Sequence, residues 1–112
     1  FAYGYLTLPG QWWYDHVAAA LGPEGGRAWL ADAFQLTELA VAPEQQGRGL
    51  GGALHDALLA GVTAPRAVLS TLDAPTVGFG MYGRRGWAPL LAGFRFPGVA
   101  RPYAVLGRVM GA

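Results

Sequence analysis

The sequence predicts an α/β protein in the broad sense, with a mixed central sheet flanked by helices. Apolar, β-prone runs alternate with stretches in which apolar residues recur at helical spacing, in the order β, α, β, α, β, α, β, β. The last two strand-like segments follow one another through a hairpin connection, which makes the sheet a mixed one. The 112 residues, 53% of them apolar, fit one domain spanning residues 1–112 and exclude a disordered tail.

Composition narrows the classes of function. The chain has no cysteine, which excludes a disulfide framework, a cysteine nucleophile and a thiolate metal site, and no metal cofactor is expected. The net charge is +1 and the eight basic residues are all arginines scattered along the chain, which argues against a nucleic-acid partner. No run approaches the roughly 18 apolar residues of a membrane span, and no signal-peptide pattern is present. We therefore expect a cytoplasmic protein with no membrane partner.

The first half of the chain contains two predicted strands with helical segments between them. Phe1 to Leu8 alternates aromatic and small residues like a strand with one covered face. Gln11 to Leu21 has the apolar spacing of a short amphipathic helix. The glycine- and proline-containing stretch 22–26 then breaks the chain, and Arg27 to Ala33 is expected to form further helical turns. Phe34 to Val41 is apolar enough for a buried strand.

The second half begins with the strongest helical pattern of the chain. One face of this helix is predicted to consist of Leu50, Leu54, Ala57, Leu58 and Gly61. The opposite face carries His55 and Asp56, so we expect His55 to be solvated. Ala67 to Leu72 follows as a short strand.

A third helix and two strands complete the predicted order. The helix is expected to have Pro75 in its first turn and to end near Arg85, with Gly86 as the left-handed residue after it. Trp87 to Leu91 and Tyr103 to Met110 then form the last two strands.

A glycine-rich segment between the second strand and the second helix predicts an anion-binding loop. Glycines at 47, 49, 51 and 52 let backbone N–H groups approach a ligand, and the helix that begins there adds unpaired donors and the positive end of its dipole. The chain has no lysine, which excludes a Walker loop, and the spacing fits a dinucleotide fingerprint only loosely. A pyrophosphate-containing ligand is therefore expected here.

The run Gln46-Gly47-Arg48-Gly49-Leu50-Gly51 matches the pattern Gln/Arg-x-x-Gly-x-Gly/Ala, and there the sequence resembles the GNAT superfamily of N-acetyltransferases. The resemblance implies an acyl-CoA N-acyltransferase-like fold in which two central parallel strands splay apart to admit the pantetheine arm of acetyl-CoA. It also implies that the pyrophosphate is held by this loop. The implied cofactor-binding residues are Leu39, Ala40, Val41, Gln46, Gly47, Arg48, Gly49, Leu50, Gly51 and Gly52.

A second segment, Met81 to Trp87, is similar to the family's aliphatic-Tyr-x-x-x-Gly-Phe pattern, with Trp87 in place of phenylalanine. The resemblance implies that Tyr82 is the acid that protonates the departing CoA thiolate. Pro75 and Gly78 stand where the family often has asparagine and alanine. The similarity covers about Phe34 to Met110, and the family's usual N-terminal strand and helices are lacking. We therefore expect the chain to be the C-terminal two-thirds of an acetyltransferase domain.

The family mechanism implies direct attack of an acceptor amine on the thioester. Proton transfer from a tyrosine of pKa about 10 to a thiolate of pKa about 8.5 is uphill by roughly 2 kcal/mol. This cost is small enough for Tyr82 to act as the acid. Transfer from an amine of pKa about 10.4 to a glutamate of about 4.3 is uphill by about 8 kcal/mol. Glu38 as the base therefore needs a water chain, desolvation or an acceptor of low pKa. The alternative role for Glu38 is to bind the substrate.

The expected partner is a small-molecule or peptide amine acceptor. An alternative is a catalytically weak or inactive acyl-CoA-binding module that associates with a partner or with itself, for example as a homodimer. An exposed edge at the first strand favours such pairing.

Overall fold

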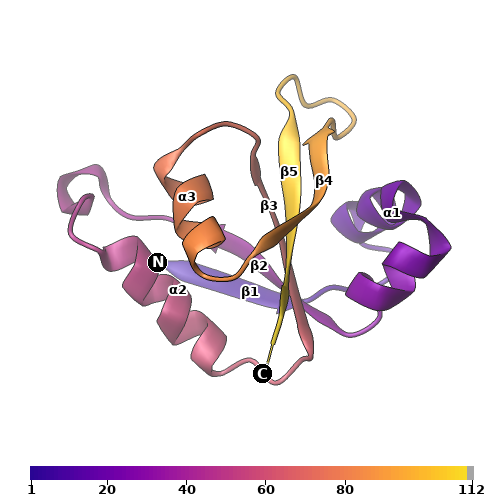
Figure 1. The fold of residues 1–112 in the computed structure, drawn as a ribbon, viewed down its shortest axis with the longest axis horizontal. Coiled ribbons are helices and arrows are strands. Elements are labelled where there is room, and N and C mark those ends of the chain that lie inside the picture. The colour runs from indigo at the N-terminus through magenta and orange to yellow at the C-terminus, as the bar shows by residue number, and fades with distance from the viewer. Residues whose placement is uncertain (111–112) are drawn as a thin grey trace.

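The structure, a computed structural model, describes residues 1–110 and has the predicted order of elements with one short 3-10 helix added (Figure 1). The elements are β1 (Ala2–Leu6), α1 (Trp12–Leu30), β2 (Ala33–Leu39), η1 (Pro43–Gln45), α2 (Leu50–Ala60), β3 (Arg66–Leu72), α3 (Val77–Arg84), β4 (Ala88–Phe94) and β5 (Tyr103–Val109). The predicted α/β class with a mixed sheet is confirmed.

The five strands form one sheet in the order β1-β2-β3-β5-β4. The β2–β3 pair is parallel, and the other three neighbouring pairs are antiparallel. Pairing of β2 with β3 covers Ala33–Gln35 against Arg66–Val68 and stops there, although β2 continues to Leu39 and β3 to Leu72. The two central strands therefore part towards their carboxyl ends.

Helices cover both faces of the sheet, with α2 and α3 on one side and α1 on the other (Figure 1). Each face has its own apolar core. The core on the α2 and α3 side consists of Leu36, Leu59, Ala67, Leu69, Met81, Tyr82, Trp87, Ala104 and Leu106. The core on the α1 side consists of Val17, Leu30, Ala33, Val68, Phe96 and Val105. Within the described residues, no helix has both the length and the apolar character needed to span a bilayer.

Helix α1 is kinked where the sequence predicted a longer break. Gly22 alone leaves helical geometry, with φ 78° and ψ 173°, and the helix resumes at Pro23. Proline is tolerated at the first helical position because an N–H there has no acceptor within the helix, so its absence costs no hydrogen bond. The prediction that stretch 22–26 is non-helical is thus wrong beyond Gly22, and Ala33 belongs to β2 rather than to a helix.

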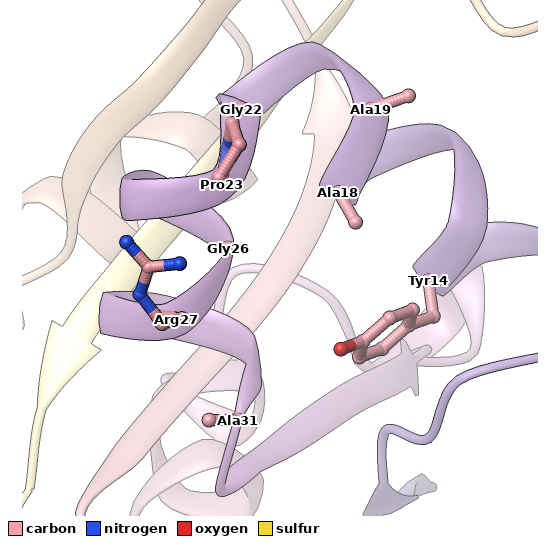
Figure 2. Close-up of a pocket in the computed structure, with 8 residues that line it drawn as sticks. All are labelled: Tyr14, Ala18, Ala19, Gly22, Pro23, Gly26, Arg27 and Ala31. Carbon is pink, nitrogen blue, oxygen red and sulfur yellow. The ribbon is translucent and has the colours of Figure 1, made fainter.

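The kink leaves a hollow of about 400 Å³ on the surface of α1. Figure 2 shows Tyr14 and Arg27 on opposite sides of it, with small residues between them. Its lining comes almost entirely from α1 itself.

The buried face of α2 differs from the predicted one. The helix buries Gly52, His55 and Leu59, while Ala57 and Gly61 are exposed. The prediction that His55 is solvated is wrong, because its ring nitrogens have partners inside the protein, as described below.

Helix α3 begins at Val77, after the proline that was predicted to lie in its first turn. Thr76 is its N-cap, and the side-chain oxygen of Thr76 accepts a hydrogen bond from the Phe79 amide at 3.0 Å. Pro75 therefore precedes the helix instead of lying in its first turn. Gly86 has φ +86°, which confirms the predicted left-handed residue after the helix.

Candidate functional site

The loop between β2 and α2 leaves the first turn of α2 open. Gly47 and Gly49 have φ values of 78° and 77°, which other residues rarely adopt, so only glycine fits here without strain. Gly49 is the N-cap of α2 and supplies no side-chain cap, so the first amides of the helix keep their donors free of side-chain partners. The Gln46 side chain donates to the Val41 carbonyl at 3.1 Å and fixes the fold of the loop.

A cavity of about 640 Å³ lies beside this loop, where the ends of β2 and β3 part. It is bounded by the loop, the first turn of α2, and α3. The lining residues are Leu39, Val41, Gln46, Gly47, Gly49, Leu50, Gly51, Gly52, Thr71, Thr76, Val77, Gly78, Met81, Tyr82, Arg84 and Arg85. Two segments separated by about 30 positions in the sequence, the glycine loop and α3, thus meet in one site.

The structure places two of the predicted cofactor residues outside this lining. Arg48 is exposed, and its Nη1 donates to the Gln45 side chain at 3.3 Å. Ala40 pairs with Phe1 through both backbone groups, which points those groups away from the gap between β2 and β3. Because backbone groups alternate along a strand, those of Leu39 and Val41 point towards the gap.

Glu38 is also outside the cavity lining. Leu39 and Val41 face Gly51 on the α2 side, so alternation directs the Glu38 side chain to the opposite face of the sheet. There it is exposed, and the Tyr3 hydroxyl lies 3.5 Å from its Oε2.

Tyr82 lies on α3 with its side chain in the wall of the cavity and only 8% of its surface exposed. Burial raises the pKa of its hydroxyl above the ordinary value of about 10. The hydroxyl therefore stays protonated at neutral pH, as an acid must before it acts.

No family model matches the sequence. The "GCN5-like protein acetyltransferase Rv2170" of Mycobacterium tuberculosis is 38% identical over 117 residues, which cover 97% of this chain and 57% of the relative. The chain resembles the GNAT family of acetyltransferases. It spans somewhat more than half the length of this curated GNAT relative.

Solved GNAT structures share the fold. The NatC complex bound to Gag peptide and CoA matches with a TM-score of 0.65 and 16% identity, over 70% of this chain and 52% of that one. A GNAT family acetyltransferase from Elizabethkingia anophelis with acetyl-CoA bound matches with a TM-score of 0.60 and 16% identity, over 70% and 61%. The structure of SsHAT is 28% identical over 84% of this chain and 42% of that one, with a TM-score of 0.58. The GNAT resemblance and the fold that it implied are confirmed.

The position where the GNAT pattern has phenylalanine is occupied by Trp87, and this difference brings a hydrogen bond. The Trp87 indole Nε1 donates to His55 Nε2 at 2.9 Å, and both side chains are buried, with 5% and 1% of their surfaces exposed. Because the indole can only donate, His55 Nε2 is the acceptor and the ring proton is on Nδ1. His55 Nδ1 then donates to Asp56 Oδ1 at 2.8 Å.

Asp56 connects this buried pair to the cavity. Its Oδ1 also accepts from Arg85 Nε at 3.1 Å, and Arg85 lines the cavity next to Gly52. The hydrogen bond from His55 and then that from Arg85 hold the pKa of Asp56 below its ordinary value. No local pattern in the sequence predicted this network. Its one signal was Trp87, since a buried indole needs an acceptor.

Residues 1–110 contain no group of three or more histidine, aspartate or glutamate side chains that could hold a metal ion.

Proposed function

We propose that this chain carries the acetyl-CoA site of an N-acetyltransferase, which transfers an acetyl group to a primary amine. The observation that supports this most directly is the convergence of the glycine loop, the parted strands and Tyr82 on one cavity. Two of the GNAT structures that share this fold contain CoA or acetyl-CoA.

The residues present fit acetyl-CoA. Free amides at the start of α2 suit the pyrophosphate, and each hydrogen bond to a charged oxygen contributes about 1.5–3 kcal/mol. The backbone groups of Leu39 and the amide of Val41, whose carbonyl already accepts from Gln46, face the gap beyond the last β2–β3 pair, where an extended arm can pair as an added strand. When bound, acetyl-CoA supplies an acetyl group activated as a thioester.

Tyr82 is proposed to give its proton to the leaving sulfur. Its raised pKa makes this transfer more uphill than the roughly 2 kcal/mol expected for an ordinary tyrosine, while keeping the proton in place until it is needed. Positioned acids contribute typically 10²- to 10⁴-fold to rate.

Glu38 is proposed to meet the acceptor amine. It lies on the face of β2 opposite the α2 side, so it approaches the parted strands from the side that α1 covers. There a carboxylate can bind the ammonium form of the acceptor or pass its proton through water to solvent. The acceptor class proposed is an amine on a small molecule or peptide; NatC is bound to a peptide, and Rv2170 is called a protein acetyltransferase.

Thermal melting with and without CoA tests the binding half of the proposal. At 100 times the dissociation constant, a ligand that binds only the folded state adds about 2.7 kcal/mol of stability, so the melting temperature is expected to rise by several degrees. NAD and ATP serve as controls and are expected to give no comparable shift. No shift with millimolar CoA would contradict the proposal.

The catalytic half is tested with Tyr82→Phe. This variant is expected to bind CoA as wild type does and to lose about 100-fold in kcat, because only the proton donor is removed. Release of the CoA thiol from acetyl-CoA in the presence of amine probes measures the loss. An unchanged kcat at all pH values would remove Tyr82 from the acid role.

A second candidate, self-association, is favoured by β1. This strand lies at one edge of the described sheet, and its large side chains, Tyr3, Tyr5 and Leu6, are exposed, as is Phe1 just before it. An exposed apolar edge is a template for pairing with another chain. A dimer in sedimentation that gains no stability from CoA would favour this candidate over the enzyme.

A further inference from the structure

We propose that the hydrogen-bonded chain Asp56–His55–Trp87, in which His55 and Trp87 are buried and Asp56 is exposed, is a positioning device for Tyr82, with His55 as its central residue. The inference rests on the proposed role of Tyr82 as the acid. It adds His55 and Asp56, which neither the loop motif nor the tyrosine motif contains, and it gives a role to the tryptophan that ends the tyrosine motif.

The His55 ring is fixed in one orientation by two hydrogen bonds of opposite sense. Nε2 accepts from Trp87 at 2.9 Å and Nδ1 donates to Asp56 at 2.8 Å. A flip of the ring would exchange Nε2 for the carbon Cε1 opposite the indole N–H and leave that N–H without an acceptor, in a site where His55 is only 1% exposed. Unpaired buried polar groups are costly, so the orientation is strongly preferred.

Tyr82 packs directly against this fixed ring. The centroids of Tyr82 and His55 are 6.1 Å apart, those of Tyr82 and Trp87 are 5.9 Å apart, and those of His55 and Trp87 are 6.1 Å apart. The three rings form a closed triangle in which Tyr82 meets the edge or tilted face of both neighbours, the arrangement that aromatic pairs prefer. An apolar side chain at 55 could fill the same space, but it would have no hydrogen bonds to fix its angle.

The outer end of the chain reaches the glycine loop. Asp56 Oδ1 accepts from both His55 and Arg85, and the Arg85 guanidinium lies so close to Gly52 that a Cβ there would collide with it. One carboxylate oxygen therefore connects the wall behind Tyr82 to the start of α2. Its lowered pKa keeps it ionised at neutral pH, as a dual acceptor requires.

The test uses Trp87→Phe, which keeps an aromatic ring against Tyr82 and removes the N–H that donates to His55, together with part of the buried indole ring. With acetyl-CoA and N-α-acetyl-lysine amide as the amine probe, kcat is expected to fall about tenfold, with KM for acetyl-CoA within twofold of wild type. In a Tyr82→Phe background the same change is expected to alter kcat by less than twofold, because no hydroxyl is left to position. Trp29→Phe, the same change in a half-buried tryptophan outside the network, serves as the matched control and is expected to keep wild-type kcat.

An unchanged kcat in Trp87→Phe, or an equal loss in both backgrounds, would overturn the proposal. Failure of the proposed function looks different, because wild type would then release no CoA thiol or Tyr82→Phe would match wild type.

A second readout needs no turnover. The tyrosinate absorbance of each protein, minus that of the same protein carrying Tyr82→Phe, isolates the titration of Tyr82. In Trp87→Phe the pKa of Tyr82 is expected to move towards its ordinary value as the looser wall admits water, and an unmoved pKa would overturn the proposal as well.

Discussion

Two glycine-rich turns in this molecule precede helical segments, and only one of them makes a site. Gly49 before α2 and Gly22 inside α1 have nearly the same left-handed φ, 77° and 78°. The first opens onto a cavity of about 640 Å³ at the parted ends of β2 and β3. The second borders a hollow of about 400 Å³ lined by α1 residues (Figure 2).

The difference lies in what surrounds each turn. Beside Gly49, the ends of two strands, a second helix and the polar side chains of Tyr82, Thr71 and Arg85 face the same space. Beside Gly22 the next residue is Pro23, which has no N–H to offer a ligand. A glycine turn before a helix is therefore not sufficient to make an anion-binding site. The turn must also lie at the carboxyl ends of the central strands.

The difference between the two turns is tested most directly by adding one methyl group to each of them. Neither Gly49 nor Gly22 has a neighbour within 4 Å of a Cβ, so alanine at either position costs backbone strain alone. The strain is about 1–2 kcal/mol at Gly49, which is left-handed helical with ψ 8°, and up to about 3 kcal/mol at Gly22, whose ψ of 173° belongs to a region that glycine alone populates readily. Gly49→Ala is expected to weaken CoA binding about tenfold, because relief of that strain turns the α2 amides away. Gly22→Ala is expected to lower stability by at least as much as Gly49→Ala and to leave CoA affinity within twofold. Calorimetric titration with CoA measures both, and equal losses of affinity would contradict the assignment of the site to the first turn.

A smaller effect is expected at the N-termini of α3 and α1, two helices on opposite faces of the sheet. The Thr76 side chain caps α3, whereas α1 has no side-chain cap at Gln11. Thr76→Ala is expected to cost about 1 kcal/mol and to lower the melting temperature by about 4–8 °C. Thr76→Ser, which keeps the oxygen, is expected to restore most of it. A serine variant as unstable as the alanine variant would show that the methyl group, and not the cap, matters here.

The smallest expected effect concerns the cavity wall at high pH. Burial raises the pKa of Tyr82 in the folded state, while the unfolded chain releases that proton near pH 10. Above pH 10 the unfolded state thus binds fewer protons, and the stability contributed by Tyr82 is lost as pH rises through the folded pKa. Between pH 9 and 11 wild type is expected to lose more stability than Tyr82→Phe, measured by urea unfolding. Parallel curves for the two proteins would indicate that water reaches the hydroxyl freely.

Local patterns in the sequence predicted the element order and the glycine loop because both depend on neighbours in the chain. Strand and helix periods are short-range signals, and Gly47 and Gly49 occupy backbone conformations that only glycine adopts readily. The loop spacing was specific enough to identify the GNAT family. The convergence of this loop with Tyr82 followed from the family resemblance rather than from the residues themselves.

Two parts of the site depended on contacts that local patterns do not contain. His55 is buried because its acceptor nitrogen meets Trp87, 32 positions later. The face on which Glu38 lies depends on an irregularity in the β1–β2 register, where Tyr3 pairs with Glu38 but Gly4 pairs with Leu36. The extra residue, Thr37, reverses the alternation after Leu36, and no local sequence feature marks it.

The short β2–β3 pairing also has a consequence for cooperativity. Three residue pairs join a two-stranded part of the sheet, β1–β2, to a three-stranded part, β3–β5–β4, in which β3 pairs with β5 along its whole length. The seam between them is the weakest ladder in the sheet, so amide exchange is expected to report two units opening at different free energies. A ligand arm that pairs with both sides of the gap would fasten these units together, and substrate binding would then determine whether the domain unfolds in one step or in two.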